Sequence, residues 1–279
     1  IGYSPTNFAN EPFPAIVTEY APNGSLDEII NLERMSYAPP LWNDTKKLIN
    51  IYGIASAMAY LHSHGIIHRD LKPANILEDE FLFPKIADFG LSKMSHQSAE
   101  SMTAQSIVGF KGTPIYVPPE GWETNQYTKA GDVYAFSIII YELLTLEEPF
   151  KDCTMVMIFN KIAIKKERLE FKYPIADCYK ELITRCWAQN PDERPTFDEI
   201  VKELKTNKDF ITDSVDQDDF YDYIDLIDSQ GSSFDPNKKF QQITLSQKPV
   251  KIIEDEEVKP IRIKEVELCQ IKNNYNNNE

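Results

Sequence analysis

One short stretch of the chain concentrates side chains that could act on a phosphate group. The segment HRDLKPAN, residues 68–75, places Asp70 five positions before Asn75, with Lys72 between them. A carboxylate can accept a proton from an attacking hydroxyl, and an ammonium group can neutralise charge on a transferred group. A carboxamide oxygen can hold a hard cation such as Mg²⁺. Asp88, in the sequence KIADFG thirteen residues after Asn75, is a candidate for a second oxygen ligand.

Three of the four histidines lie close to this stretch, namely His62, His64 and His68. A metal site would require their side chains to converge on one point together with a carboxylate or thiolate. His62 and His64 stand two residues apart at the end of a predicted helix, so they project in different directions. Gly65 then breaks that helix before His68. The spacing argues against a zinc site, and we expect none of the three to be a metal ligand.

The composition is that of an ordinary soluble globular protein. Of the 279 residues, 42% are hydrophobic and 26% are charged, which suits a chain that buries a sizeable core. The net charge is −15 and the isoelectric point is near 4.8. A charge of this sign argues against unassisted binding to nucleic acid or to an anionic membrane, so neither is an expected partner.

No membrane-spanning or secretory segment is predicted. The longest strongly apolar stretch, FSIIIYELL at 136–144, is too short to span a bilayer. The opening residues IGYSPTNFAN lack the basic segment and apolar core of a secretory signal. We expect reduced thiols in a cytoplasmic protein, because the cysteines lie far apart without a C-x-x-C pair. The cysteines are Cys153, Cys178, Cys186 and Cys269.

The periodicity of apolar residues predicts a mainly helical mass with a few short strands, as far as about residue 205. Residues 44–65 fit a helix that is capped by Asp44 and closed by Gly65. PAIVTEY, residues 14–20, predicts a buried strand. Further helices are predicted at 128–145, 154–167, 177–189 and 196–205, and short strands at 66–67, 76–77 and 85–87.

The chain changes character after residue 205. Residues 209–228 carry eight Asp and no Lys or Arg, and the chain ends in NNYNNNE. Charge runs of this kind are usually solvated, so we expect residues 206–279 to be an acidic, low-complexity and largely disordered tail. Two alternatives remain open. One is a strand at 258–268 that pairs with an unidentified partner. The other is a short docking helix whose apolar side would consist of Phe220, Tyr223, Ile224 and Ile227.

Taken together, these motifs resemble the protein kinase family, which pairs an H-R-D-x-x-x-x-N catalytic loop with a D-F-G metal-binding motif. Four further segments resemble family signatures and follow the family's order. They are the hinge-like VTEYAPNGSL (17–26), the activation-segment end GTPIYVPPE (112–120), the central-helix start GDVYAFS (131–137) and the late CWAQNPDERPTF (186–197). Because several signatures agree over residues 1 to about 205, the resemblance is far more specific than any one motif.

The resemblance implies an α+β fold of the protein kinase kind. The chain would contain mainly the α-helical C-terminal lobe, preceded by the last strands of the N-terminal lobe and followed by the disordered acidic tail. Residues 1–205 would be a kinase domain that begins midway through its small lobe, and residues 206–279 would be the tail.

The resemblance also implies a role for each motif residue. Asp70 would be the catalytic base and Lys72 would stabilise the transferred phosphate, while Asn75 and Asp88 would hold Mg²⁺ beside ATP. Thr113, in the substrate-binding part of the activation segment, would contact Asp70 and Lys72. The residues implied to contact ATP are Thr18, Glu19, Ala21, Leu77 and Asp88. The residues implied to be structural are His68 and Phe89, which would pack against each other, Arg69, Gly90, Asp132, and the pair Glu120 and Arg194.

Thr18 has a second interpretation. In the family its position is that of the gatekeeper to the pocket behind adenine, yet an ordinary β-branched strand residue would fit equally well. Glu19 and Ala21 would contact adenine only through backbone groups, so their side chains do not distinguish the two interpretations.

The residues at the variable positions of these motifs indicate one group within the family. Lys72 in Asp-Leu-Lys-Pro-Ala-Asn and Thr113 are similar to serine/threonine kinases, whereas PNGSL at 22–26 and the CW-x-x-NP-x-x-RP-x-F pattern at 186–197 resemble tyrosine kinases. This mixture is typical of the tyrosine-kinase-like group, whose members mostly phosphorylate Ser and Thr. The implied activity is therefore ATP-dependent phosphorylation of protein substrates on serine or threonine.

Part of the family's nucleotide-binding apparatus does not occur in the sequence. It contains no G-x-G-x-x-G, and its first lysine is Lys46, too late to be the strand lysine that pairs with the ATP phosphates. Two explanations compete: a kinase that begins before residue 1, or an inactive kinase-like module that kept the fold for binding. The first is favoured by the intact set of Asp70, Lys72, Asn75 and Asp88. On that view residues 1–279 alone should show no turnover, because half of the nucleotide clamp is missing.

The segment Asp88–Glu120 is long and rich in hydroxyl groups. A connection of this length within a compact domain is usually functional or disordered. In the family, the arginine before the catalytic aspartate, Arg69 in this chain, responds to a phosphate on this segment, so an upstream activating kinase is an expected partner. The candidate phosphorylated residues are Ser92, Ser95, Ser98, Ser101, Thr103 and Ser106.

Overall fold

The chain forms two units in the computed structural model, Ile1–Glu19 with Lys238–Glu279, and Tyr20–Asn237. The structure describes residues 2–6, 11–13, 15–90, 92–94, 113–124, 127–231 and 241–242.

The first unit contains a three-stranded sheet. β1 (Gly2–Ser4) pairs antiparallel with β2 (Ala15–Val17) and parallel with β7 (Gln241–Gln242). β2 is shorter than the strand predicted over 14–20, and the side chain of Ile16 is 78% exposed where a buried strand was expected. Strands of two or three residues offer little surface for a second layer to cover.

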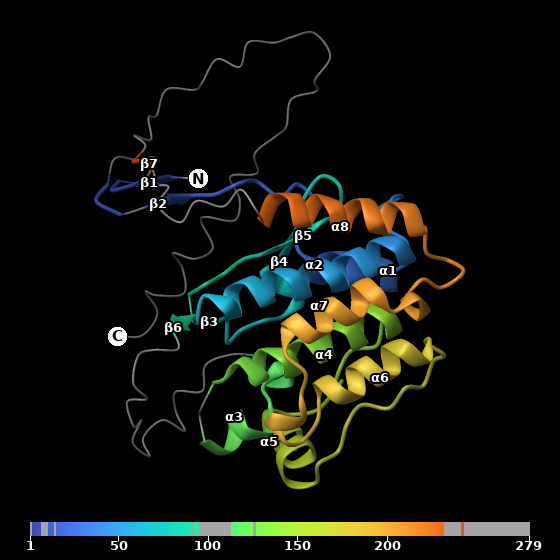
Figure 1. Ribbon diagram of the computed structural model, residues 1–279. Coiled ribbons are helices and arrows are strands. Elements are labelled where there is room, and N and C mark those ends of the chain that lie inside the picture. Colours follow the sequence, from blue (N-terminus) through green and yellow to red (C-terminus); the bar gives the residue numbers. More distant parts are fainter. Residues whose placement is uncertain are drawn as a thin grey trace. The chain divides into compact units, whose positions relative to one another are not determined.

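The second unit is mostly helical (Figure 1). Its helices are α1 (Leu26–Arg34), α2 (Asp44–Ser63), α3 (Pro119–Thr124), α4 (Lys129–Thr145), α5 (Met155–Phe159), α6 (Asp177–Cys186), α7 (Phe197–Thr206) and α8 (Gln217–Gly231). Its strands pair as β3 (Ile66–Ile67) with β6 (Lys93–Met94), and β4 (Ile76–Glu78) with β5 (Pro84–Ile86). Short helical turns are η1 (Pro73–Asn75), η3 (Pro114–Tyr116), η4 (Asn160–Ile164), η5 (Pro191–Glu193) and η6 (Lys208–Phe210). The predicted α+β class is confirmed.

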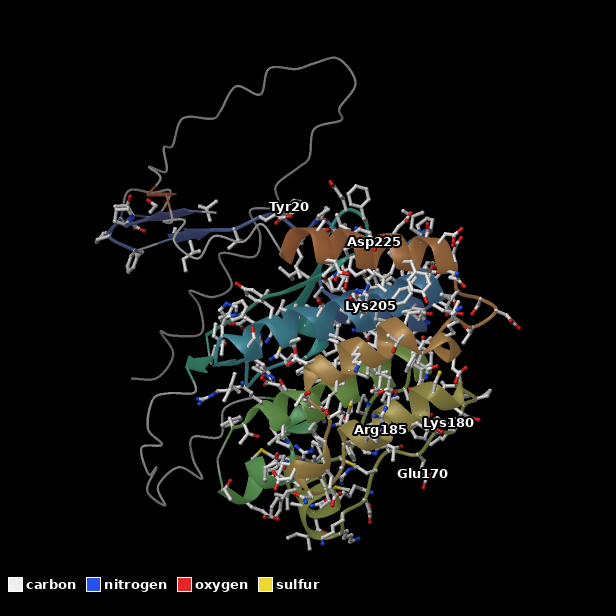
Figure 2. All side chains as sticks on the ribbon, in the orientation of Figure 1. Tyr20, Glu170, Lys180, Arg185, Lys205 and Asp225 are labelled. Atoms are coloured by element: carbon white, nitrogen blue, oxygen red, sulfur yellow. The ribbon has the colours of Figure 1, made fainter. Side chains whose placement is uncertain are left out.

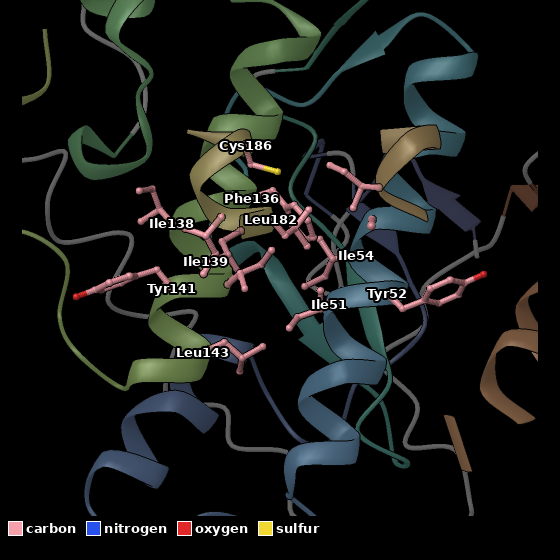
Figure 3. Packing of buried hydrophobic residues seen from close by; sticks show 14 of the residues in the cluster. Ile51, Tyr52, Ile54, Phe136, Ile138, Ile139, Tyr141, Leu143, Leu182 and Cys186 are labelled. Atoms are coloured by element: carbon pink, nitrogen blue, oxygen red, sulfur yellow. The ribbon is translucent and has the colours of Figure 1, made fainter. Parts of the chain in front are cut away.

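α2 and α4 form the centre of this unit. Both helices are apolar on nearly every side and are buried over most of their length, as expected of helices inside a domain. Figure 3 shows Ile51 and Ile54 of α2 facing Phe136 and Ile139 of α4, while Tyr52 points to the other side of α2. Among the described residues, no helix combines the length and apolar character needed to cross a membrane.

The ends of the helices differ from the predicted ends by a few residues. α2 is capped by Asn43, whose Oδ1 accepts the N–H of Lys46 at 2.9 Å, and Asp44 is instead the first helical residue. The helix predicted over 154–167 is shorter and changes its winding, since α5 ends at Phe159 and continues directly as the wider π-helical turn η4 to Ile164.

α1 was not predicted, although its sequence carries a start signal. Ser25 and Glu28 form a capping box, in which each side chain accepts the backbone N–H of the other residue. The helix buries Leu26, Ile29 and Ile30, and the other residues of its mainly polar sequence are partly buried or exposed. Because the apolar side of α1 is so narrow, the capping box is the clearest sequence signal that a helix begins here.

The β4–β5 hairpin lies against α2 and carries the two candidate metal ligands at its open end. Ile76 is opposite Ile86 in the antiparallel register. The Asp79 side chain closes the turn by accepting the N–H groups of Phe81 and Phe83, at 2.9 and 3.0 Å. The hairpin therefore has a fixed register although its strands are only three residues long.

Residues 208–231 differ from the expectation of a largely disordered tail. They fold into η6 and α8, and α8 lies along α2 on the side opposite α7 (Figure 1). Phe220, Tyr223 and Ile224 are at most 4% exposed, whereas every aspartate of α8 is exposed. The alternative of a short docking helix describes this part, because the aspartates occupy the face that the apolar residues leave free. The strand considered at 258–268 lies outside the described residues.

The packing of α8 depends on a glycine in α2. A Cβ atom added at Gly53 would lie 2.3 Å from Tyr223 Oη and 2.7 Å from Pro84 Cγ. Both distances are shorter than real carbon contacts, so only glycine fits between α8 and the hairpin.

We therefore expect Gly53→Ala to destabilise the protein by about 1–3 kcal/mol through overpacking. Helix propensity alone predicts the opposite sign, a gain of about 1 kcal/mol. The free energy of unfolding of Gly53→Ala, measured by urea denaturation, distinguishes overpacking from the gain in helix propensity. Gly131→Ala is the matched control, because a Cβ there would have its nearest neighbour, Pro118 Cγ, at 3.4 Å. A Gly53→Ala protein as stable as the wild type would contradict the prediction.

The hairpin also buries a carboxyl group. Glu78 has no exposed surface, and its closest recorded partner is Asn50 Nδ2, at 3.5 Å from Oε2. Within the described residues, Glu78 Oε1 and Asn50 Oδ1 have no hydrogen-bond partner. Burial raises the pKa of Glu78 to about 8, an effect opposed by its hydrogen bond with Asn50. The neutral acid is thus the stable form in the folded protein near neutral pH.

This pKa predicts a stability that falls with rising pH. Between the ordinary carboxyl value of 4.5 and about 8, the folded state holds a proton that the unfolded chain releases. Stability should fall across this window by up to about 1.4 kcal/mol per pH unit. Glu78→Gln removes the titrating group, so the decline between pH 5.5 and 8.5 in urea denaturation should flatten. Glu80→Gln, an exposed neighbour in the same turn, should keep the wild-type slope. Equal slopes in Glu78→Gln and wild type would overturn the assignment.

Candidate active site

The loop that carries Asp70 is held from below by the carboxylate of Asp132. Asp132 lies in the first turn of α4 and is 2% exposed. Its Oδ2 accepts the backbone N–H of His68 and its Oδ1 accepts that of Arg69, both at 2.9 Å. Arg69 has a φ of 72°, a left-handed conformation that a non-glycine residue keeps only where its surroundings enforce it. The two hydrogen bonds supply that constraint just before Asp70.

His62 has a larger part in the site than the sequence suggested. It was expected merely to end a helix, but it is 6% exposed and its Nε2 lies 2.8 Å from Asp132 Oδ2. Its ring also contacts Phe197 edge to face, at 5.1 Å between centroids. A usable signal was present, since position 62 continues the buried spacing of Ile51, Ala55 and Met58 along α2.

The other two histidines near the loop have separate surroundings. His64 is exposed and lies over Tyr60, with 4.3 Å between ring centroids. His68 is fully buried, and its ring lies 5.4 Å from that of Phe89. The contact between His68 and Phe89 that the resemblance implied is therefore present in the structure.

Three of the predicted residues, Lys72, Asn75 and Thr113, lie around the Asp70 side chain. Lys72 Nζ lies 2.8 Å from Asp70 Oδ2 and donates to Thr113 Oγ1 at 3.1 Å. Asn75 Nδ2 donates to the Asp70 carbonyl at 2.8 Å and to Asp70 Oδ2 at 3.1 Å. The turn η1 brings Asn75 back to Asp70, so positions five apart become neighbours. A carboxylate, an ammonium group and an amide thus share one small region.

Asp88 comes to the same end of the hairpin as Asn75. The Ala87 N–H donates to the Asn75 carbonyl at 2.9 Å, which extends the β4–β5 pairing by one step and leaves Asp88 next in line. Asp88 is exposed and has a φ of 59°, and its Oδ1 accepts the Gly90 N–H at 3.1 Å. Within the described residues, Asn75 Oδ1 and Asp88 Oδ2 accept no recorded hydrogen bond. These two oxygens fit the needs of a hard cation such as Mg²⁺.

A small cavity lies beside Asp70, under the segment that begins at Thr113. Its lining includes Arg69, Asp70, Thr113, Tyr116, Tyr127 and Asp132. The Arg69 guanidinium lies over the Tyr127 ring, 5.5 Å from its centroid. The cavity is therefore lined by the Asp70 carboxylate on one side and by aromatic and hydroxyl groups on the other.

The segment after this cavity is anchored by the predicted pair of Glu120 and Arg194. The guanidinium binds the carboxylate through two hydrogen bonds, of 2.7 and 2.8 Å. Arg194 also donates to the carbonyls of Ala130 and Ala188, both at 2.9 Å. Because these bonds satisfy a buried guanidinium, the pair fixes the geometry of α3 against α4 and η5.

The buried carboxylate of Glu142 holds the middle of the same segment. Tyr116 Oη donates to Glu142 Oε1 at 2.6 Å, and Arg34 Nη2 donates to Glu142 Oε2 at 3.1 Å. Burial raises the pKa of Glu142, and burial together with the neighbouring Glu142 raises the pKa of Tyr116. No local pattern predicted this contact, because its members come from three distant segments.

The predicted ATP-contacting residues are divided between the two units. Thr18 and Glu19 belong to the first unit, while Ala21, Leu77 and Asp88 belong to the second. Leu77 is half-buried in β4, where it forms a bridge with Ser25. Flanking this bridge, the Glu78 N–H donates to the Gly24 carbonyl at 2.9 Å.

Of the candidate phosphorylated residues, the structure describes Ser92, whose Oγ lies 3.5 Å from the His68 carbonyl oxygen. The others lie outside the described residues: Ser95, Ser98, Ser101, Thr103 and Ser106.

Several proteins named as kinases have sequences similar to this chain. The family model described as "Protein kinase domain" matches residues 6–204. The chain is 38% identical over 209 residues to receptor-interacting serine/threonine-protein kinase 2 of Bos taurus. It is 36% identical over 198 residues to probable serine/threonine-protein kinase drkC of Dictyostelium discoideum. It is 35% identical over 194 residues to serine/threonine/tyrosine-protein kinase HT1 of Arabidopsis thaliana.

These three matches each cover 70% of this chain, but 38%, 25% and 47% of the respective relatives. The chain thus spans less than half the length of each of them. The names of these relatives are consistent with the expected tyrosine-kinase-like group. The match over residues 6–204 covers well over half of the chain and includes every motif residue around Asp70. The chain belongs to the protein kinase family.

Proposed function

We propose that this protein transfers the γ-phosphate of ATP to serine or threonine hydroxyl groups of protein substrates. The observation that supports the proposal is the arrangement around Asp70, whose Oδ2 lies 2.8 Å from Lys72 Nζ and 3.1 Å from Asn75 Nδ2. Relatives named as serine/threonine-protein kinases support the same activity.

In this proposal Asp70 orients the substrate hydroxyl and accepts its proton. The carboxylate is held by a loop whose backbone is fixed on Asp132, so little reorganisation is needed when a hydroxyl arrives. Lys72 stays close enough to neutralise charge on the transferred group, and Thr113 keeps the ammonium group in place through the 3.1 Å hydrogen bond. Positioning and electrostatics are the main demands of phosphoryl transfer.

The residues fit a bound Mg²⁺. Asn75 Oδ1 and Asp88 would hold it, since both offer hard oxygen atoms at one end of the hairpin. When bound, Mg²⁺ would neutralise negative charge on the phosphates of ATP. Asn75 keeps Oδ1 directed away from Asp70, because its Nδ2 already donates to that residue twice.

The proposal has a regulatory part. Arg69 lines the cavity next to Asp70 and contacts Tyr127, so a phosphate added to the segment 91–112 by an upstream kinase would have a guanidinium to pair with. We also infer a cytoplasmic location, where the free thiols of Cys153, Cys178 and Cys186 would persist.

A second candidate function is that of a kinase-like binding module without turnover. Residues 1–279 contain no G-x-G-x-x-G sequence, which catalysis would require elsewhere in the full-length protein. The contacts of Asp70, Lys72 and Asn75 favour catalysis, because a module released from chemistry has no need to keep all three within hydrogen-bonding distance.

Asp70→Asn tests the proposed base. The change removes a proton acceptor and little volume, so kcat of the full-length protein should fall by about 10²–10⁴-fold while the folded structure is kept. The measurement is incorporation of labelled phosphate into serine, threonine and tyrosine peptides, with circular dichroism to check folding. Asp198→Asn, an exposed change on α7, is the control and should leave kcat unchanged. Unchanged turnover in Asp70→Asn would rule out its role, and a wild type without turnover would favour the binding module.

Asp88→Ala tests the proposed metal ligand. Loss of a charged oxygen should weaken Mg²⁺-dependent nucleotide binding by at least about tenfold, measured by titration of the full-length protein with and without Mg²⁺. Because Asp88 has a φ of 59°, Asp88→Asn is a second variant that tolerates this backbone and removes only the charge. Asp192→Ala, exposed in η5, is the control. Equal Mg²⁺–nucleotide affinity in wild type and both Asp88 variants would refute the assignment.

A further inference from the structure

α8 lies beyond residues 6–204, the part of the chain matched by the family model. It is nevertheless attached to the rest of the second unit at both ends. Before its first turn, the Asp216 N–H donates to Thr45 Oγ1 at 2.8 Å, close to the start of α2. Near its other end, Asp228 pairs with Lys205 of α7, which is labelled in Figure 2. α8 is thus fixed along α2 over most of its length.

Between these two attachments, aromatic side chains fill the contact. Phe220 meets Tyr52 of α2 edge to face, with 5.8 Å between ring centroids. Tyr223 lies 6.3 Å from the same Tyr52 ring and 4.6 Å from Phe83. Phe83 is in the turn of the β4–β5 hairpin, so Tyr223 links α8 to the hairpin as well as to α2.

The hairpin needs such a support. An isolated pair of three-residue strands is marginal in water and gains its stability from what packs against it. α2 covers one side of the β4–β5 hairpin, and Tyr223 reaches its turn from α8 and lies over Gly53 beside Pro84, the first residue of β5. Any tilt of the hairpin would move its open end, where Asn75 and Asp88 lie.

We propose that α8 is a working part of the kinase domain, in which Tyr223 is a positioning residue that fixes the β4–β5 hairpin and thereby the spacing of Asn75 and Asp88. The functional domain then extends past residue 205 to residue 231. The proposal rests on the proposed function for its effect on nucleotide binding, whereas its effect on the hairpin stands on the packing alone.

The test compares three variants on α8 in the full-length protein. Tyr223→Ala removes the ring, Tyr223→Phe keeps the ring and removes only the hydroxyl, and Leu226→Ala changes a side chain that is 40% exposed. Hydrogen exchange, followed by mass spectrometry, reports on the hairpin residues 76–87. The central helix α4 serves as the internal reference for overall stability.

In Tyr223→Ala, exchange over 76–87 should be at least about tenfold faster than in the wild type, while exchange in α4 stays the same. The dissociation constant for nucleotide in the presence of Mg²⁺ should rise severalfold, and without Mg²⁺ it should change little. Tyr223→Phe should restore both values, and Leu226→Ala should match the wild type.

Two results would overturn the proposal. Equal acceleration in the hairpin and in α4 would mean that α8 contributes only overall stability. Unchanged hairpin exchange in Tyr223→Ala would mean that the hairpin needs no support from α8. Should Tyr223→Ala fail to fold, Tyr223→Leu gives the same comparison with less loss of apolar volume. If the wild type itself binds no Mg²⁺–nucleotide, the proposed function fails, while the exchange comparison still decides the role of α8.

Discussion

The structure around the candidate active site depends on one buried carboxylate, that of Asp132. It accepts two backbone N–H groups from the loop before Asp70 and lies 2.8 Å from His62. A buried carboxylate is strongly unfavourable without such partners. Loss of one of the three contacts would therefore weaken the other two. α2, α4 and the loop are therefore joined at a single side chain. The position of Asp70 follows from the most buried helix of the unit.

Two further carboxylates, the partly buried Glu120 and the buried Glu142, hold the segment that follows Thr113. Glu120 binds Arg194 through two hydrogen bonds, and Glu142 binds both Tyr116 and Arg34. Such pairs lose hydration on burial, so they set geometry more than they add net stability. The segment beside the cavity is thus held at two points by groups that belong to the helical core.

The sequence predicted best what is local. α2 and α4 have long apolar patterns and were placed within a few residues. Residue types and spacing on one short loop also singled out Asp70, Lys72 and Asn75, and in the structure the latter two lie within hydrogen-bonding distance of Asp70. Contacts across long separations were expected only where the family resemblance implied them, as for Glu120 and Arg194, which are 74 positions apart. The contacts of His62 with Asp132, 70 positions apart, and of Arg34 with Glu142, 108 apart, were missed because no local pattern links such positions. The composition of α8 favoured the wrong interpretation. Its many aspartates suggested a solvated tail, although its apolar residues follow helical spacing.

The aspartates of α8 give its attachment an unusual dependence on ionic strength. Asp218 and Asp222 stand four residues apart on the exposed face, and Asp225 follows three residues later. Like charges at these spacings repel each other, and a negative charge late in a helix also opposes the helix dipole. Dissolved salt screens these repulsions, and it also screens the attraction between Lys205 and Asp228 and that of the first-turn aspartates Asp218 and Asp219 for the helix dipole. The ionic strength of the solution therefore acts on α8 through opposing effects. Dissolved cations around the exposed aspartates thus influence how α8 packs on α2.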